Sequence, residues 1–234
     1  MNNQYQHIKV IGFDADDTLW VNETYFREAE LSFAKLLAPF ETANKIDQEL
    51  FKKEIENLPL YGYGIKGFVL SMVEMAIELS NNTISNQVIS DILDIGKDML
   101  NKPVELLEGV EDTLKTLSQS YRLILVTKGD LLDQERKLEK SNLSDYFHHI
   151  EVLSDKKEQN YSKLLKHLDI SPSEFLMVGN SLKSDILPLV NIGAQAVHVP
   201  FHTTWLHEQV HEQEVKDKSY GTLKSLSDLK SLFN

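Results

Sequence analysis

Short runs of consecutive apolar residues recur along the chain and are separated, in its second half, by stretches with helical periodicity. Apolar runs without polar alternation are typical of strands that are buried on both faces. Four such runs occupy residues 8–13, 123–127, 175–179 and 196–199, and a weaker one covers residues 149–153. Strands that alternate with helices favour a parallel sheet joined by right-handed crossovers. The pattern therefore predicts an α/β core with a doubly wound, mainly parallel sheet.

Residues 21–103 interrupt this alternation with four consecutive helical patterns and no strand between them. In the third pattern, Phe68 and Met72 recur at the spacing that places apolar residues on one face of a helix. Consecutive amphipathic helices predict an all-helical subdomain inserted after the first strand. We therefore expect a core formed by residues 1–20 and 104–234, with residues 21–103 as the helical insertion.

The composition narrows the classes of partner and environment. With 24 Lys and Arg against 36 Asp and Glu, the formal net charge of −12 disfavours nucleic acids and anionic membranes as partners. The chain has no cysteine, which excludes disulfide bonds and thiolate metal sites and fits a reducing cytoplasm. It shows neither a basic leader before a long apolar run nor a stretch of about 18 apolar residues. We therefore expect a cytoplasmic protein that does not bind or span a membrane.

Polar and charged side chains gather where the predicted strands end. The carboxyl ends of parallel strands meet at one edge of the sheet, where ligands bind in such folds. The residues concerned are Asp14 and Asp16 after the first strand, Thr127 at the end of the second, Asn180 and Asp185 after the third, and Lys156 and Lys157 after the weak strand. We expect these side chains to share one site.

This set of side chains is suited to the transfer of a phosphoryl group. Paired carboxylates bind a hard divalent cation such as Mg²⁺, which takes oxygen ligands and keeps several waters. The cation and a lysine would offset the charge of a phosphate dianion, which otherwise repels an aspartate nucleophile. One carboxylate can attack phosphorus to form an aspartyl-phosphate, and a second can protonate the leaving alcohol and then activate water. The hydroxyl and backbone amides near Thr127 can hold the phosphoryl oxygens.

Four motifs in this order carry a resemblance to a known superfamily. The first is DADDT, residues 14–18, behind an apolar strand, and the second is LILVTKGD with Thr127. The third is a lysine ahead of a helix in SDKKEQNY, with Lys156 as our choice and Lys157 beside it. The fourth, MVGNSLKSDI, is similar to a GDSxxxD pattern, with Asp185 as its second acid. The chain thus resembles the haloacid dehalogenase-like hydrolase superfamily, and within it the capped aspartate-nucleophile phosphatases.

The resemblance implies catalytic roles for four residues. Asp14 would be the nucleophile, and Asp16 would act as general acid and then as general base. Thr127 would bind the phosphate. Lys156 would also contact the phosphoryl group and offset its charge and that of Asp14. The helical insertion falls where one class of this superfamily carries its cap.

The metal site implied by the resemblance consists of Asp14, Asp16 through its carbonyl, Asn180 and Asp185. Asn180 stands where the family usually has an aspartate, so this site loses one negative charge, although an amide oxygen can still bind Mg²⁺. Lys128 is a second departure, because a small or amide residue is commoner after the threonine. It would either contact phosphate or substrate, or point to solvent.

A glycine-rich stretch, LPLYGYGIKGF at residues 58–68, joins two helices of the insertion. It is either a plain connection or a substrate-binding loop. In capped phosphatases of this superfamily such a loop faces the active site and selects the substrate. On that resemblance we expect Tyr61, Tyr63 and Lys66 to contact the substrate.

A second motif points to a different chemistry. His207, Glu208 and His211 match the HExxH pattern of zinc peptidases, in which two histidines share one face of a helix and the glutamate is the base. No third ligand follows at a suitable distance, and the match lies beyond the last predicted core strand. We therefore interpret it as a chance match.

Two further alternatives remain within the same fold. A hydrolytic 2-haloacid dehalogenase would need neither Mg²⁺ nor a second acid, so Asp16 and Asp185 favour a phosphate substrate. A non-catalytic binding protein conflicts with the intact first motif. We therefore expect Mg²⁺-dependent hydrolysis of a small phosphorylated metabolite through an aspartyl-phosphate. Sugar phosphates, phosphoglycolate-like acids and nucleoside monophosphates all remain open as substrates, and the sequence does not predict an oligomeric state.

Overall fold

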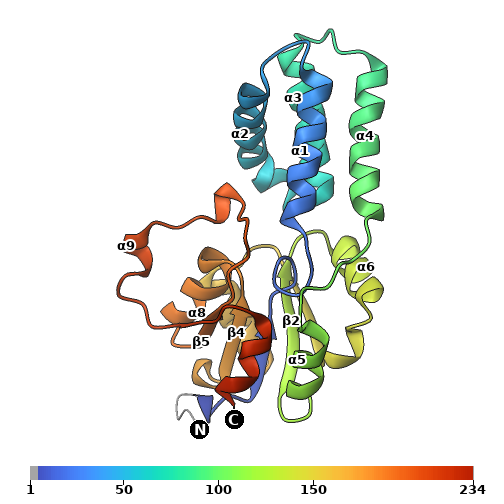
Figure 1. The fold of residues 1–234 in the computed structure, drawn as a ribbon. Helices are drawn as coiled ribbons and strands as arrows, with labels where there is room; N and C mark the ends of the chain where they lie inside the picture. The colour runs from blue at the N-terminus through green and yellow to red at the C-terminus, as the bar shows by residue number, and fades with distance from the viewer. Residues whose placement is uncertain (1–4, 234) are drawn as a thin grey trace. The chain divides into compact units, whose positions relative to one another are not determined.

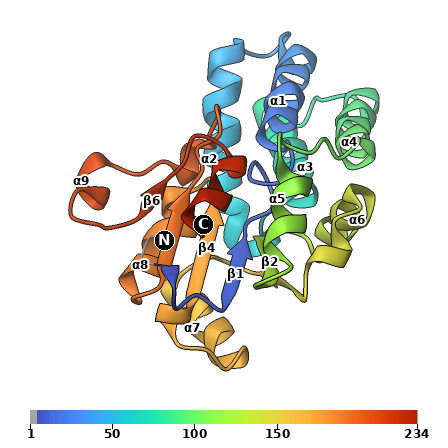
Figure 2. The same cartoon turned by 60° about the horizontal axis from the view of Figure 1, so that its bottom comes forward.

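Six parallel strands form one sheet in the computed structural model, which describes residues 5–233. The strands are β1 (Val10–Phe13), β2 (Arg122–Lys128), β3 (His149–Leu153), β4 (Phe175–Gly179), β5 (Gln195–His198) and β6 (Gly221–Thr222). Their spatial order is β3-β2-β1-β4-β5-β6, so β1 lies between β2 and β4 (Figure 2). Each neighbouring pair in this described part is parallel. This confirms the predicted doubly wound α/β core.

Apolar cores on both faces explain why the strands lack polar alternation. The α-helices that follow the insertion, from residue 104 to residue 233, are α5 (Val110–Leu117), α6 (Leu131–Ser141), α7 (Glu158–His167), α8 (Leu187–Asn191) and α9 (Glu212–Val215). Ile11 and Phe13 of β1 belong to a core that includes residues of α5, and Val10 belongs to a second core with residues of α7 and α8. Between them, Gly12 leaves room for the ring of Phe175, to which a Cβ at residue 12 would approach within 2.5 Å. Such a sheet buries its strands on both sides.

The sheet differs from the sequence prediction at its far edge. β6 has only two residues, Gly221–Thr222, and pairs with β5 through Val197 and His198. A strand of two residues has no periodicity that a sequence pattern can reveal. The predicted strand at residues 196–199 is shifted by one residue, to Gln195–His198.

The inserted helices lie together (Figure 1). Their buried apolar side chains form a hydrophobic core of their own. The helices are α1 (Glu23–Leu37), α2 (Ala43–Tyr61), α3 (Ile65–Leu79) and α4 (Asn86–Asn101). Phe68 and Met72 of α3 are both buried in this core, together with Phe33 of α1 and Ile92 of α4. The apolar face predicted for the third helix is therefore the face that packs.

The chain divides into two compact units along this difference in secondary structure. The first contains the described residues up to Glu23, Val104–Lys128, and the residues from Glu135 onward; the second contains Thr24–Pro103 and Gly129–Gln134. The segment Gly129–Gln134 falls within the range expected for the core, but it groups with the helices. Within that helical unit, Lys66 Nζ of α3 forms an ion pair with Asp130 Oδ1 of this segment at 2.9 Å. Among residues 5–233, no helix has both the length and the apolar character required to cross a membrane.

Candidate active site

Asp14 stands at the carboxyl end of the central strand of the sheet. β1 ends at Phe13, and the backbone N–H of Asp14 donates to the carbonyl of Val178 on β4 at 2.9 Å. The register pairs Phe13, the last residue of β1, with Val178 next to the end of β4 and with Leu125, three residues before the end of β2, so Thr127 of β2 lies beyond the end of β1. Asp14 and Thr127 are both buried there. The parallel register therefore brings the residues that follow β1, β2 and β4 to one edge, as the sequence predicts.

A buried lysine joins the first and fourth motifs. Lys156 Nζ donates to Asp14 Oδ1 at 2.5 Å and to Asp185 Oδ1 at 2.7 Å. The lysine side chain is only 2% exposed. Lys157 differs, because its side chain is 74% exposed and pairs with Asp155 at 2.7 Å. Of the two candidate lysines, Lys156 is the one that the structure places against Asp14.

The ionisation of these groups is strongly coupled. Burial raises the pKa of Asp14 to about 7, with a further contribution from the charge on Asp185, while Lys156 opposes both effects. Burial acts to lower the pKa of Lys156, but Asp14 and Asp185 hold that pKa well above its usual value. The lysine therefore stays charged and supplies the positive charge that the two buried carboxylates need.

Asp16 has a different environment from Asp14. Its Oδ1 accepts hydrogen bonds from Trp20 Nε1 at 2.7 Å and from Lys137 Nζ, on α6, at 2.6 Å. Its side chain is 21% exposed, and that of Lys137 is 16% exposed. Asp16 is thus partly exposed and hydrogen-bonded, whereas Asp14 is buried, and its role as acid and base stays a prediction.

Asp17, the third acid of the first motif, stabilises the start of a helix. Asp17 adopts φ 62°, a left-handed conformation that Asp tolerates better than most residues. Its carboxylate accepts hydrogen bonds from the backbone N–H groups of Asn22 at 2.8 Å and Glu23 at 3.0 Å, where α1 begins. Burial raises the pKa of Asp17 to about 8, although these hydrogen bonds oppose the shift. Asp17 therefore holds the start of a helix, and two acids are left for chemistry.

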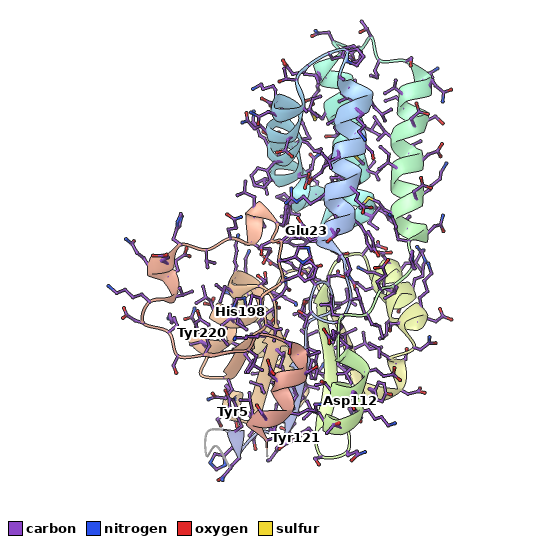
Figure 3. All side chains as sticks on the ribbon, in the orientation of Figure 1. Tyr5, Glu23, Asp112, Tyr121, His198 and Tyr220 are labelled. Atoms are coloured by element: carbon purple, nitrogen blue, oxygen red, sulfur yellow. The ribbon has the colours of Figure 1, made fainter. Side chains whose placement is uncertain are left out.

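Asn180 lies directly against the first motif. Its backbone N–H donates to Thr18 Oγ1 at 3.1 Å, and Thr18 Oγ1 in turn donates to Asp14 Oδ2 at 2.8 Å. Its carbonyl oxygen lies 3.0 Å from Nε2 of His198. His198 is the last residue of β5 and is labelled in Figure 3. A carbonyl oxygen only accepts hydrogen bonds, so this nitrogen of His198 carries the proton. The backbone of Asn180 is thus held from both sides.

The side chain of Asn180 lies beside the Asp14 carboxylate and the Asp16 carbonyl. One terminal atom of its amide is 3.2 Å from Asp14 Oδ2 and 3.2 Å from the carbonyl oxygen of Asp16. With its NH₂ group at that position, the amide donates to both oxygens. With its oxygen there, the amide and the two acceptors are spaced like neighbouring ligands of Mg²⁺, which lie about 3 Å apart when each metal–oxygen distance is about 2.1 Å. These residues therefore fit Mg²⁺.

Asp185, the remaining residue of the expected metal site, lies on a π-helical turn, Leu182–Ile186, of a kind that is frequent at functional sites. Its Oδ2 accepts a hydrogen bond from the backbone N–H of Ser181 at 3.0 Å. A Cβ on Gly179 would lie 2.3 Å from that oxygen, so only glycine leaves room for it. The set holds two carboxylates, one carbonyl and one amide. Accordingly, no group of three His, Cys, Asp or Glu side chains within residues 5–233 is placed to hold a metal.

Lys128 does not have the surroundings expected of a solvent-facing side chain. Its Nζ donates to Ser184 Oγ at 2.9 Å and forms an ion pair with Glu208, and its side chain is 16% exposed. Thr127, beside it on β2, is 1% exposed. The structure thus gives Lys128 protein partners, and its contact with substrate stays a prediction.

The other residues expected to bind substrate belong to the helical unit. Tyr61 ends α2, and its hydroxyl donates to Glu74 Oε1 at 2.5 Å. Lys66 is the residue paired with Asp130, and Tyr63 lies between Gly62 and Gly64, which both have positive φ. The connection therefore needs its glycines. A role in substrate selection stays a prediction for all three residues.

A model of one protein family matches most of this chain. The family is described as haloacid dehalogenase-like hydrolase, and the match covers residues 8–193. The chain belongs to the haloacid dehalogenase-like hydrolases. This confirms the family that the four motifs indicate, and the remaining comparisons concern members of it.

Three relatives show how the similarity is distributed. A glyceraldehyde 3-phosphate phosphatase from Pyrococcus abyssi is 30% identical over 81% of this chain and 80% of its own. An N-acylneuraminate-9-phosphatase from Rattus norvegicus is 27% identical over 86% of this chain and 83% of its own. The crystal structure of a haloacid dehalogenase-like family hydrolase from Xanthomonas campestris is 36% identical, with a TM-score of 0.86 over 99% of this chain and 94% of that one. The similarity thus extends through both units.

In this hydrolase, the segment that matches HExxH does not form the single helix that the zinc-peptidase pattern requires. Leu206–Glu208 forms a short 3₁₀ turn, Gln209 is extended, and His211 precedes α9. The two histidines therefore do not lie on one face of a single helix. Glu208 instead accepts hydrogen bonds from Ser181 and Ser184, which agrees with the interpretation of the motif as a chance match.

Several residues at this edge of the sheet have no role in the sequence prediction. They are Thr18, Trp20, Lys137, Ser181 and Ser184, and Glu208 joins them because its only predicted role belongs to the HExxH alternative. Thr18 is the last residue of the first motif and is detectable on that ground. Lys137 and Glu208 reach the site from segments far away in the sequence. No local pattern marks Lys137, and the HExxH pattern around Glu208 indicates a different role.

Proposed function

We propose that this hydrolase is a Mg²⁺-dependent phosphatase that hydrolyses a small phosphate monoester through an aspartyl-phosphate on Asp14. The observation that carries the proposal is the set of contacts around the Asp14 carboxylate. Lys156 holds one oxygen, Thr18 holds the other, and Asn180 lies beside the second oxygen. A nucleophile must be held in a fixed orientation next to positive charge to approach a phosphate dianion.

The first step forms the phosphoenzyme. An Asp14 carboxylate oxygen attacks phosphorus, and the bond from phosphorus to the ester oxygen breaks. Asp16 gives its proton to the leaving alcohol oxygen. Thr127 and Lys156 bind the phosphoryl oxygens, and Lys156 offsets their charge.

The second step releases orthophosphate. Asp16, now ionised, removes a proton from water, and the water oxygen bonds to phosphorus as the bond between phosphorus and the Asp14 oxygen breaks. Asp14 returns as a carboxylate. A bound Mg²⁺ would be held by Asp14, the Asp16 carbonyl, Asn180 and Asp185, and it supplies charge stabilisation for the phosphoryl oxygens.

The names of two relatives support a proposal for the substrate class. They are named for glyceraldehyde 3-phosphate and for N-acylneuraminate 9-phosphate, which are both phosphate monoesters of sugar-type compounds. We propose a sugar-phosphate substrate of that kind, and not a nucleic acid, because the net charge of −12 opposes one. The absence of cysteine supports a reducing compartment, the cytoplasm.

A screen of phosphate esters with and without Mg²⁺ tests the proposal. It should include the two named esters, a phosphoglycolate-like acid and a nucleoside monophosphate, with orthophosphate release as the readout. We expect release that requires Mg²⁺ and disappears in Asp14→Asn. Release that persists in Asp14→Asn, or that is unaffected by removal of Mg²⁺ with a chelator, would contradict it.

A further inference from the structure

Glu208 is a buried acid that the proposed reaction does not use. It ends the 3₁₀ turn Leu206–Glu208, in the segment after β5, and its side chain is 11% exposed. Its Oε1 forms an ion pair with Lys128 Nζ. Its Oε2 accepts hydrogen bonds from Ser181 Oγ at 2.5 Å and from Ser184 Oγ at 2.6 Å. One carboxylate therefore binds three side chains.

These three partners come from two strand ends of the candidate site. Lys128 is the last residue of β2 and follows Thr127. Ser181 and Ser184 belong to the turn between β4 and α8, which also carries Asp185. Lys128 Nζ donates to Ser184 Oγ as well, at 2.9 Å. Glu208 thus links the end of the phosphate-binding strand to the turn of the metal site.

The hydrogen bonds within that turn depend on the direction of the Ser181 hydroxyl. A hydroxyl has one proton, and Ser181 donates it to Glu208. Its lone pairs can then accept the backbone N–H of Ser184, which lies at 3.0 Å. The backbone N–H of Ser181 donates to Asp185 Oδ2 at 3.0 Å. The orientation of the Asp185 carboxylate therefore rests on a turn that Glu208 holds.

A second contact ties the same segment to the same turn. Lys183 Nζ donates to the carbonyl oxygen of His207, next to Glu208, at 2.6 Å. Burial acts to raise the pKa of Glu208, but Lys128 and the two serine hydroxyls lower it to about 2. Glu208 is thus an ionised acceptor throughout the working pH range, and its contacts do not change with pH there.

We propose that Glu208 is a positioning residue that fixes the turn carrying Asn180 and Asp185, and through it the affinity of the site for Mg²⁺. The inference rests on the proposed phosphatase function, since it assumes that this turn binds the cation. In Glu208→Gln the side chain keeps one oxygen, which can accept from the two serine hydroxyls or face Lys128 Nζ, but not both. Loss of the serine contacts loosens the turn, and loss of the Lys128 contact leaves less negative charge beside the lysine, which then repels the cation more strongly, so either loss weakens Mg²⁺ binding.

Glu208→Gln tests this inference with a side chain of the same size. Mg²⁺ affinity is measured by calorimetry in the presence of orthophosphate, so the readout does not require turnover. We expect at least a tenfold loss of Mg²⁺ affinity in Glu208→Gln. The matched control is Glu212→Gln, in the exposed helix α9 a few residues further on, and it should stay within twofold of the parent.

The kinetics separate positioning from a general loss of stability. In a positioning role, Glu208→Gln raises the Mg²⁺ concentration for half-maximal activity, and saturating Mg²⁺ restores most of kcat. A merely structural role would lower the melting temperature and kcat without changing the Mg²⁺ requirement. Ser181→Ala is the second variant, in case Glu208→Gln does not fold, and it should weaken Mg²⁺ binding at least threefold.

The outcomes distinguish this inference from the function on which it rests. If the parent binds Mg²⁺ with orthophosphate, and folded Glu208→Gln or Ser181→Ala binds it equally well, the positioning role is wrong and the phosphatase proposal stands. If the parent itself binds no Mg²⁺ with orthophosphate, both proposals are wrong.

Discussion

Replacement of Lys156 by methionine removes the charge that two buried carboxylates share. Lys156 Nζ lies 2.5 Å from Asp14 and 2.7 Å from Asp185, and neither carboxylate is more than 9% exposed at its side chain. Methionine has a similar length, so Lys156→Met removes the charge with little change in volume. It leaves two buried carboxylates beside one another without their cation.

The magnitude follows from these distances. At an effective dielectric constant of about 20, each contact is worth about 6 kcal/mol before the desolvation of the partners is counted. Breaking a buried ion pair from one side typically costs about 3–5 kcal/mol in net stability. For a chain of 150–250 residues this corresponds to a fall in melting temperature of about 6–20 °C. Because the carboxylates can become neutral by binding protons, the loss should be smaller at pH 5 than at pH 8.

Thermal unfolding followed by circular dichroism measures this loss, with chelator and then with Mg²⁺. Mg²⁺ should recover more stability in Lys156→Met than in the parent, since the cation replaces the missing positive charge. Lys157→Met is the matched control. Its side chain is 74% exposed and pairs only on the surface, so its melting temperature should stay within about 2 °C of the parent.

Two results would refute the reasoning. The first is a melting temperature for Lys156→Met within about 2 °C of the parent in the absence of Mg²⁺, since the two carboxylates would then not need the lysine. The second is an equal loss in Lys157→Met, because the charge of the exposed lysine has no buried partner.

Further predictions concern the two acids, the metal ligand and the pH dependence of stability. Asp14→Asn should abolish orthophosphate release, because an amide does not attack phosphorus. Asp16→Asn should lower kcat by about 10²–10⁴-fold, because the leaving group loses its proton donor. Equal kcat values for Asp16→Asn and the parent would contradict the second expectation. Asn180→Asp should bind Mg²⁺ more tightly than the parent in calorimetry without phosphate. It should also reduce the coupling free energy between Mg²⁺ and phosphate binding, which is typically about 1–3 kcal/mol. Unchanged Mg²⁺ affinity would mean that residue 180 is not a ligand. The pKa of Asp14 is about 7 in the fold against 3.8 ordinarily, so the folded state favours its protonated form. In the presence of a chelator, the free energy of unfolding measured in urea should therefore fall as the pH rises from about 4 to about 7. The fall should be less steep in Asp14→Asn. An equal slope in Asp14→Asn and the parent would contradict the raised pKa of Asp14.

Much of the site could be predicted because a parallel sheet places its strand ends together. Asp14, Thr127 and Asn180 each follow an apolar run, and the sheet aligns the ends of those runs through its register. The apolar runs in turn are readable because both faces of the sheet are covered, so no polar alternation hides them. For these residues, a local pattern and a general property of the fold were sufficient.

The choice between Lys156 and Lys157 depends on a different kind of information. The two residues are adjacent and have the same chemistry, so composition and spacing treat them alike. One side chain turns inward to Asp14 while the other pairs with Asp155 at the surface. Lys156 contacts Asp14 and Asp185, which are 142 and 29 residues away in the sequence, so no local pattern shows which lysine turns inward.

Glu208 shows why part of the site could not be predicted. Its partner Lys128 is 80 residues away in the sequence. Its local pattern, HExxH, indicates a helix and a metal, whereas the segment folds as a short 3₁₀ turn and an extended stretch. Contacts between distant segments decide its role, so the local motif misleads.

A similar limit applies to the segment Gly129–Gln134. It directly follows Thr127 and Lys128, and its sequence gives no reason to separate it from the core. It nevertheless groups with the helical unit, where Asp130 pairs with Lys66. This ion pair spans 64 residues of sequence, and a charge pair at that separation has no sequence signature.

Trapping of the phosphoenzyme tests the central claim most directly. Asp16→Asn, with Mg²⁺ and p-nitrophenyl phosphate, should form the aspartyl-phosphate, because this leaving group needs little protonation, and should hydrolyse it slowly, because the base is missing. Borohydride reduces an aspartyl-phosphate to homoserine, which mass spectrometry can locate in the peptide that carries residue 14. The account predicts homoserine at position 14, dependent on Mg²⁺ and on the phosphate ester. A reduced or phosphorylated residue elsewhere, with residue 14 recovered only as aspartate, would contradict it.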